Sequence, residues 1–103
     1  MSFSGVDIGE AVAQGVQVGD DALVVDLVDG RTITVPIAWF PRLAHAAEVE
    51  RSHWRLIGNG EGICWPQLDE DISVAGLLAG RRSHETSESL RKWLDGRKTQ
   101  GLP

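Results

Sequence analysis

Hydrophobic and polar positions along the first third of the chain predict β-strands. Residues 11–18, 22–28 and 31–37 alternate apolar and polar side chains or are rich in β-branched residues, which predicts three strands. Asp29-Gly30 separates the second strand from the third and predicts a hairpin with a type I′ turn, in which both central residues need positive φ angles. Pro36 cannot donate a hydrogen bond to a neighbouring strand, so we expect it at a sheet edge or at the end of its strand.

The middle of the chain changes from a two-residue period to a helical one and back. Apolar residues recur at helical spacing within residues 38–54, which predicts one or two short helices, with Pro41 in a first turn. A second hairpin is predicted around "NGEG" at residues 59–62. Its expected inward side chains are Trp54, Leu56 and either Ile63 or Trp65. Residues 71–80 predict a short extended and then helical segment that ends at Gly80.

Residues 83–98 have the pattern of an amphipathic helix. Ser83 is the predicted N-cap, with acidic residues early and basic residues late in the helix, as its dipole favours. The apolar stripe consists of Leu90, Trp93 and Leu94, at i, i+3 and i+4. Three such residues can dock a helix but stabilise it little in isolation, so we expect the stripe to contact either its own core or a neighbouring chain.

These elements predict an α+β domain: a small antiparallel sheet of hairpins, two or three short helices and a C-terminal amphipathic helix. We expect an α+β core over residues 1–80, a C-terminal helix over 81–98 that packs on the core or on a neighbour, and a frayed tail over 99–103. Gly80 precedes Arg81-Arg82, a polar hinge that would permit exchange of the helix between two chains, which favours a homodimer. The predicted partner-binding residues are Leu90, Trp93, Leu94, Arg81 and Arg82.

The net charge of −5 is divided unevenly along the chain. Residues 1–80 contain twelve acids and four bases, whereas residues 81–103 contain three acids and six bases. An acidic body repels phosphate backbones and suits a basic protein surface, so a protein partner is favoured over nucleic acid. Binding to DNA would have to use the basic side chains of the C-terminal segment, which are Arg81, Arg82, Arg91, Lys92, Arg97 and Lys98.

Residues 58–80 collect the side chains that suggest chemistry. Cys64 lies mid-strand with no histidine nearby in sequence, so we interpret it as a buried or half-buried structural thiol. Asp69, Glu70 and Asp71 lack the ligand spacing of a calcium loop and are interpreted as a solvent-facing turn that caps a segment beginning near Ile72.

The histidines complete no metal site in the sequence. His45 and His53 are eight residues apart, so the i, i+4 pair of a helical zinc site is absent. We therefore expect no catalytic residue, no metal ligand and no cofactor, and interpret the protein as a non-enzyme. The sequence has no 18-residue apolar run, so we expect no membrane span. Its N-terminus has no basic segment followed by an apolar one, so we expect no secretory signal. With a single cysteine, the expected location is the cytoplasm.

Three segments together resemble a known family. They are "DGRTITVPIAWFPRL", "WRLIGNGEGICWPQLDEDISVAGLLAG" and "SLRKWL", and over roughly residues 12–95 they resemble the bacterial domain-of-unknown-function family 2442. Members typically have Thr-Pro after the histidine of "RLxHA", where this chain has Ala46-Ala47. The resemblance implies a compact α+β fold with antiparallel strands and short helices, and no established catalytic residues.

The resemblance also implies partners. Some family members are fused to helix-turn-helix domains, and others resemble one half of two-gene toxin–antitoxin modules. We therefore expect a non-enzymatic protein-protein interaction module that pairs with another protein or with itself, such as an antitoxin-like or regulatory partner protein. The alternative is a DNA-associated transcriptional regulator that acts through the basic C-terminal segment.

Overall fold

The computed structural model describes residues 11–99 of the 103-residue chain, and its first half is a three-stranded antiparallel sheet. The strands are β1 (Ala13–Val18), β2 (Ala22–Leu27) and β3 (Thr32–Pro36), in the order β1-β2-β3. Ile33 and Val35 of β3 face inward while Thr32 and Thr34 are exposed, as the alternation predicts. Pro36 is the last residue of an edge strand, so its missing N–H costs no ladder hydrogen bond.

A second three-stranded antiparallel sheet follows several short helices. Its strands are β4 (Arg55–Ile57), β5 (Gly62–Trp65) and β6 (Glu70–Ser73), in the order β4-β5-β6. The α-helices are α1 (Pro41–Ala44), α2 (Glu48–Arg51), α3 (Val74–Leu78) and α4 (Ser87–Thr99). Single 3-10 turns occupy Ile37–Trp39, Gly58–Gly60 and Pro66–Leu68. Both predicted hairpins, the short central helices and the C-terminal helix are present, which confirms the α+β class.

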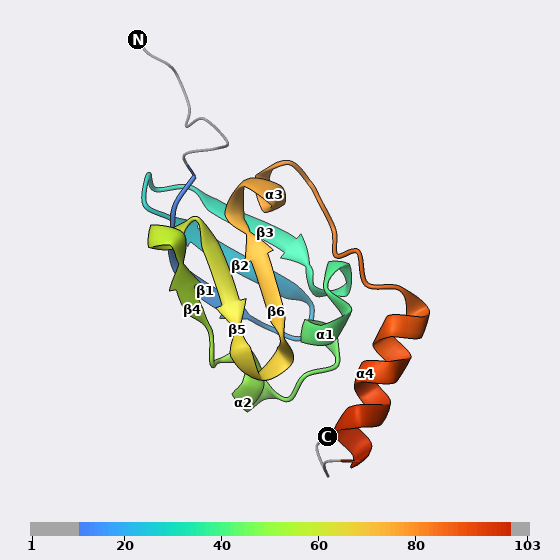
Figure 1. Cartoon of the computed structure of the whole chain (residues 1–103). Coiled ribbons are helices and arrows are strands. Elements are labelled where there is room, and N and C mark those ends of the chain that lie inside the picture. The colour runs from blue at the N-terminus through green and yellow to red at the C-terminus, as the bar shows by residue number, and fades with distance from the viewer. Residues whose placement is uncertain (1–10, 100–103) are drawn as a thin grey trace.

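The two sheets share one hydrophobic core. Figure 1 shows β4, β5 and β6 in front of β1, β2 and β3, with α4 at one side of this body. The centre of the core is Trp65, which has no solvent-exposed surface and whose indole N–H donates to the backbone carbonyl of Arg51 at 3.0 Å. Both Ile63 and Trp65 face inward, since alternate residues of β5 share one face. The indole satisfies its only polar atom at the end of α2, so the ring is buried without an unpaired donor.

Two local predictions about turns and caps are corrected by the structure. Gly30 has a φ of 98°, but Asp29 does not have a positive φ, so the turn is not type I′. Instead, Gly30 N–H donates to Leu27 O and Leu27 N–H to Arg31 O, which is a three-residue loop closed by a glycine bulge. Asp69, Glu70 and Asp71 do not cap a helix, because β6 begins at Glu70 and the Ser73 hydroxyl caps α3 by accepting from Gly76 N–H.

The N-cap of the C-terminal helix lies three residues later than predicted. The Thr86 hydroxyl accepts from Ser89 N–H and caps α4, whereas the Ser83 hydroxyl accepts from Glu85 N–H within an irregular linker. Gly80 ends α3 as predicted, with a φ of 76° and the paired backbone hydrogen bonds of a left-handed helix end. The predicted frayed tail falls on residues 99–103, of which 100–103 lie outside the described residues. Within residues 11–99, no helix combines the length and apolar character that crossing a membrane requires.

The Gly58–Gly60 turn lies close against the start of β1. Gly60 has a φ of 94°, and a Cβ placed there would lie 2.7 Å from Val12 Cγ1 and 2.8 Å from the Ala13 carbonyl oxygen. Gly30 has a similar φ of 98°, but a Cβ there would meet no atom within 4 Å. Substitutions at Gly30 and Gly60 therefore distinguish the cost of backbone strain alone from the cost of strain with steric overlap.

We expect Gly60→Ala to be much more destabilising than Gly30→Ala. The Gly30 change adds only a left-handed backbone penalty of about 1 kcal/mol, whereas the Gly60 change adds overlap with β1 and should cost about 3 kcal/mol or more. Urea unfolding of both variants measures the difference. Equal midpoints would show that the Gly58–Gly60 turn can move away from β1 freely.

Candidate functional site

The apolar stripe predicted on the C-terminal helix is divided between two faces. Trp93 packs against the core of its own chain, while Leu90 and Leu94 line a groove of about 320 Å³ on the outside. The described residues that line this groove all belong to α4, and we name them the open stripe: Ser87, Leu90, Arg91, Leu94, Asp95 and Lys98. The helix thus docks on its own chain, and two half-buried leucines beside the docked face line a groove.

A buried ion pair attaches the C-terminal end of α4 to α2. Arg97 donates to both carboxylate oxygens of Glu50, at 2.6 and 3.0 Å, and the two residues are 3% and 8% exposed. Glu50 also accepts from the Ala47 N–H at 2.9 Å, at the start of α2. The Arg97 guanidinium lowers the pKa of Glu50, with the Ala47 N–H acting in the same direction against burial. Ala47 has no side-chain cap of its own, so Glu50 stabilises this helix start as well.

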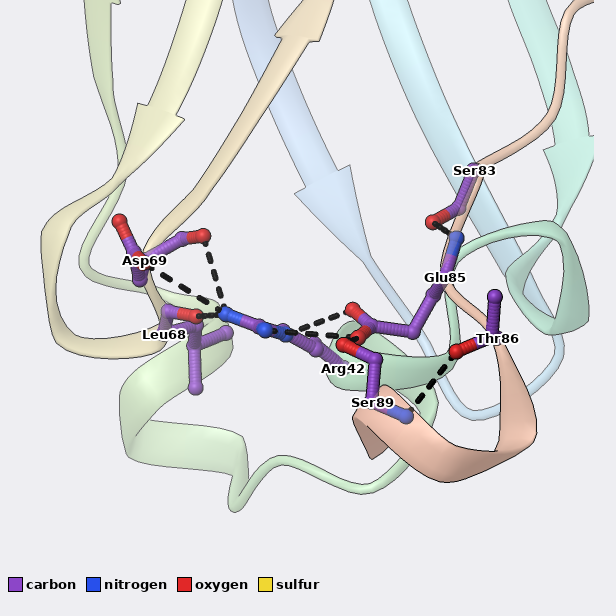
Figure 2. Close-up of polar contacts among 7 residues, drawn as sticks. All are labelled: Arg42, Leu68, Asp69, Ser83, Glu85, Thr86 and Ser89. Carbon is purple, nitrogen blue, oxygen red and sulfur yellow. Dashed lines mark hydrogen bonds and ion pairs between the residues drawn. The ribbon is translucent and has the colours of Figure 1, made fainter. Parts of the chain in front are cut away.

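A second contact holds the linker at the N-terminal end of α4. Figure 2 shows Arg42 between the Leu68-Asp69 turn and Glu85. Its guanidinium donates to Glu85 Oε1 at 2.7 Å and to the carbonyl oxygens of Leu68 and Asp69 at 3.2 and 3.3 Å. Burial alone would raise the pKa of Glu85, but the Ser89 hydroxyl and Arg42 together lower it. One arginine of α1 therefore joins the turn before β6 to the segment that leads into α4.

Trp93 lies beside both arginines that make these contacts. The guanidinium of Arg97 lies 4.5 Å from its ring centroid and that of Arg42 lies 5.3 Å away. Both distances are within the range of a cation–π interaction. The ring is therefore committed to the internal face of α4, so Trp93 is not part of the open stripe.

The other predicted partner-binding and DNA-binding residues do not form one surface. Arg81 and Arg82 lie in the exposed linker, and the Arg82 guanidinium stacks 4.8 Å from the Trp39 ring centroid. Arg97 is buried against Glu50, whereas Arg91, Lys92 and Lys98 are exposed on α4. The six basic side chains of the C-terminal segment therefore point to separate places.

Cys64 lies on the outer face of the second sheet. It is half-buried and faces Arg55 and Asp71 across the neighbouring strands. The adjacent Asp71 carboxylate raises the pKa of the thiol, which disfavours the nucleophilic thiolate. Within residues 11–99, no three His, Cys, Asp or Glu side chains are arranged to bind a metal ion.

The acidic triplet contains one side chain in an unusual environment. Glu70 is partly buried beside Asp69, Asp71 and Glu85, and its burial raises its pKa to about 7 despite the nearby Arg42 charge. Asp69 has a φ of 51° and presents its backbone carbonyl to Arg42. The triplet thus contributes to the Arg42 contact through the Asp69 backbone carbonyl, and the exposed Asp69 carboxylate lies 3.8 Å from the same guanidinium.

Glu50, Arg42 and Glu85 are the residues that sequence reasoning missed. Their partners lie 47, 26 and 43 positions away, so no local sequence pattern contains both members of a pair. One signal was available: Glu50 follows Ala47 by three residues, the spacing at which a carboxylate caps the start of a helix.

We expect Glu50→Gln to detach the C-terminal end of α4. Removing one partner leaves the Arg97 charge buried and unpaired, which should cost about 3 kcal/mol in urea unfolding at pH 7. The native pKa of Glu50 is lowered, so its ionisation stabilises the fold above the unfolded pKa, and this contribution is lost as pH falls through the native pKa. Glu88→Gln is the control, since the exposed Glu88–Lys92 pair should contribute less than about 1 kcal/mol. A Glu50 variant as stable as this control would contradict the role of the pair.

Glu70→Gln should stabilise the protein only at neutral and alkaline pH. The native pKa is raised to about 7, so ionisation of Glu70 opposes folding, and the wild type loses stability as pH rises from the unfolded value of 4.5 through about 7. The variant removes that loss. Its melting temperature should match the wild type at pH 4 and exceed it at pH 8, with Glu61→Gln, on an exposed loop, as control. A difference that does not change with pH would refute the assignment.

Two solved structures are similar to this chain, and neither has an established function. A crystal structure of a protein of unknown function from Rhodospirillum rubrum has 28% sequence identity and a TM-score of 0.64, and the match covers 79% of this chain and 98% of that one. A solution NMR structure of an uncharacterized protein from Chromobacterium violaceum has 22% identity and a TM-score of 0.61, covering 79% of this chain and 74% of that one.

The comparison of sequences gives the family. A search of curated proteins found no significant match. Residues 13–83 match the family described as "Protein of unknown function (DUF2442)", which includes both sheets and ends before α4. The chain therefore belongs to the DUF2442 family.

Proposed function

We propose that this protein is a cytoplasmic, non-enzymatic protein-interaction module that binds its partner through the open stripe of α4. The observation that carries the proposal is the division of the helix into two faces. Trp93 and Arg97 hold one face on the core, and the half-buried Leu90 and Leu94 line a groove of about 320 Å³. Two leucines beside each other on a docked helix form an apolar contact site that a partner helix can cover.

The rest of the structure supports a binding role. The side chains with altered pKa values near α4 are engaged in holding the helix: Glu50 with Arg97, and Glu85 with Arg42. The thiol of Cys64 has a raised pKa, the opposite of what a nucleophile needs. An antitoxin-like or regulatory partner protein fits this description, because such a protein acts by covering a surface of another. The separated basic side chains give no comparable support to DNA binding.

The test removes the two leucines and keeps the docked face. The double variant Leu90→Ser and Leu94→Ser should lose partner binding by about 100-fold, since burying each leucine contributes about 1.5 kcal/mol. Lys92→Ser, an exposed change outside the open stripe, is the matched control and should bind as the wild type does. Affinity purification from the native cell identifies the partner, and titration of the purified proteins measures the loss.

Three measurements would contradict the proposal. One is equal partner binding by the leucine variant and the wild type, which would place the contact elsewhere. Another is turnover of a small-molecule substrate by the wild type, and the third is DNA binding that survives at physiological salt. Circular dichroism and thermal unfolding of each variant confirm that the fold, with Trp93 docked, is retained.

A further inference from the structure

The outer edge of β6 has backbone groups that no neighbouring strand pairs. β6 is an edge strand of the second sheet, and its register with β5 places Asp71 opposite Cys64. Val74 N–H donates to Glu61 O at 3.0 Å, so the alternation of an antiparallel ladder puts Asp71 and Ser73 at positions that do not hydrogen-bond with β5. Their N–H groups and the Asp71 carbonyl therefore point away from the sheet. Among residues 11–99, no backbone hydrogen bond outside the helices and strands involves either residue.

A groove of about 290 Å³ lies beside this edge. β6 forms one wall, and residues 81–84 of the linker form the other, with the buried side chains of Phe40 and Leu77 also in the lining. Figure 1 shows this linker running from α3 to α4 past β6. The linker does not pair with the strand, because Ser83 N–H donates to Trp39 O at 3.0 Å. The groove thus leaves room at the strand edge for a short extended segment of another chain.

Glu70 lines this groove and has no hydrogen-bond partner within the described part of the chain. Its half-buried side chain lies on the same face of β6 as the buried Ile72. Burial raises the pKa of Glu70 to about 7, and the nearby Arg42 charge offsets this only in part. Arg42 itself donates to Glu85 and to the Asp69 carbonyl, as Figure 2 shows. A cationic group that entered the groove would therefore stabilise a carboxylate that the chain leaves unpaired.

We propose that this groove binds a short extended segment of a partner protein, which pairs with the outer edge of β6 and places one lysine or arginine side chain against Glu70. The site is separate from the open stripe of α4 and goes beyond the function proposed above. The outward N–H and C=O groups of Asp71 and the N–H of Ser73 provide the main-chain hydrogen bonds, and Glu70 selects the side chain. Strand addition commonly divides affinity and specificity in this way.

The charges around the groove determine which segment fits. An inward-pointing charge on an edge strand disfavours pairing with an apolar strand, so Glu70 rejects segments that have no basic residue beside it. A second copy of β6 is a poor occupant, because it would bring Glu70 and Asp71 of two chains together. Arg81 and Arg82 on the linker wall are exposed and would repel a segment with many basic residues. The expected segment therefore has a single basic side chain among polar or acidic ones.

Selection from random peptides of about seven residues, displayed on phage, tests the proposal with the full chain as bait. The selection is made at pH 8, where Glu70 is ionised. Selected sequences should share one lysine or arginine in an extended, β-branched context. A synthetic peptide with the selected sequence, titrated by fluorescence anisotropy, should bind Glu70→Gln at least about tenfold more weakly than the wild type, because it loses a charge-assisted contact. Glu61→Gln changes an exposed acid outside the groove and is the control.

The strand edge is tested with proline. Asp71→Pro removes an outward N–H without removing a hydrogen bond between β5 and β6, and should also weaken the peptide at least about tenfold. Thr34→Pro makes the same change at the matching position of the edge strand β3 and should bind as the wild type does. Circular dichroism shows which variants are folded, and Glu70→Gln decides the outcome if Asp71→Pro is not.

The outcomes are distinct from those of the proposed function. Peptides that depend on both Glu70 and the Asp71 N–H, and that bind the Leu90→Ser and Leu94→Ser double variant as well as the wild type, support the proposal. A selection that yields no binding peptide overturns it. Peptides that bind folded Glu70→Gln or folded Asp71→Pro as tightly as the wild type also overturn it, because they would occupy another surface.

Discussion

The bond between Glu50 and Arg97 determines which face of α4 is exposed. Over the described residues, α4 packs no long stretch of backbone closely against another element, and its contacts are made by long side chains. A helix held in this way could rotate about its axis unless one contact has strict geometry. The two parallel hydrogen bonds between Arg97 and Glu50 supply that geometry, because a guanidinium and a carboxylate meet in one plane. Leu90 and Leu94, both half-buried, line a groove beside this docked face.

The same bond is better explained as a determinant of position than as a large source of stability. Moving two charges out of water has a cost that their attraction only partly offsets, so a well-packed apolar pair can match a buried ion pair in stability. An apolar pair would also permit several rotations of the helix. Glu50 offsets part of the cost by accepting a third hydrogen bond, from Ala47 N–H, so the carboxylate is fully used. The acid thus links the start of α2 to the end of α4.

The contacts of α4 cross the boundary of the family match. Arg42 and Glu50 lie within residues 13–83, whereas Glu85, Trp93 and Arg97 follow that segment. The family fold contributes one charged residue to each contact, and the C-terminal segment contributes the other. Arg42 also hydrogen-bonds the backbone of the turn before β6, so the position of α4 is coupled to the second sheet.

Local patterns predicted the parts of the fold that local physics controls. The alternation of Ile33 and Val35 with threonines gave β3 its inward face, and Gly80 ended α3 because only a residue free to adopt positive φ closes a helix in that way. The Asp29-Gly30 pair fits two hairpin types, and the choice depends on where the strands resume pairing, which the dipeptide does not specify. The N-cap of α4 was misplaced because Ser83 and Thr86 are both good caps, and the linker's contact with Trp39 favours the later one.

The roles of the charged side chains were the part of the candidate site that the sequence predicted least well. The contrast between an acidic body and a basic C-terminal segment suggested a charged partner. Some of these charges pair within the chain instead, since Arg97 hydrogen-bonds Glu50 and is buried. Hydrophobic periodicity likewise placed Trp93 with Leu90 and Leu94 because it does not distinguish a docked face from an open one. The exposed bases of α4 are Arg91, Lys92 and Lys98, on the same helix as the exposed acids Glu88 and Asp95. The exposed surface of α4 is therefore mixed in charge, which favours a partner with an equally mixed surface over a uniformly charged polymer.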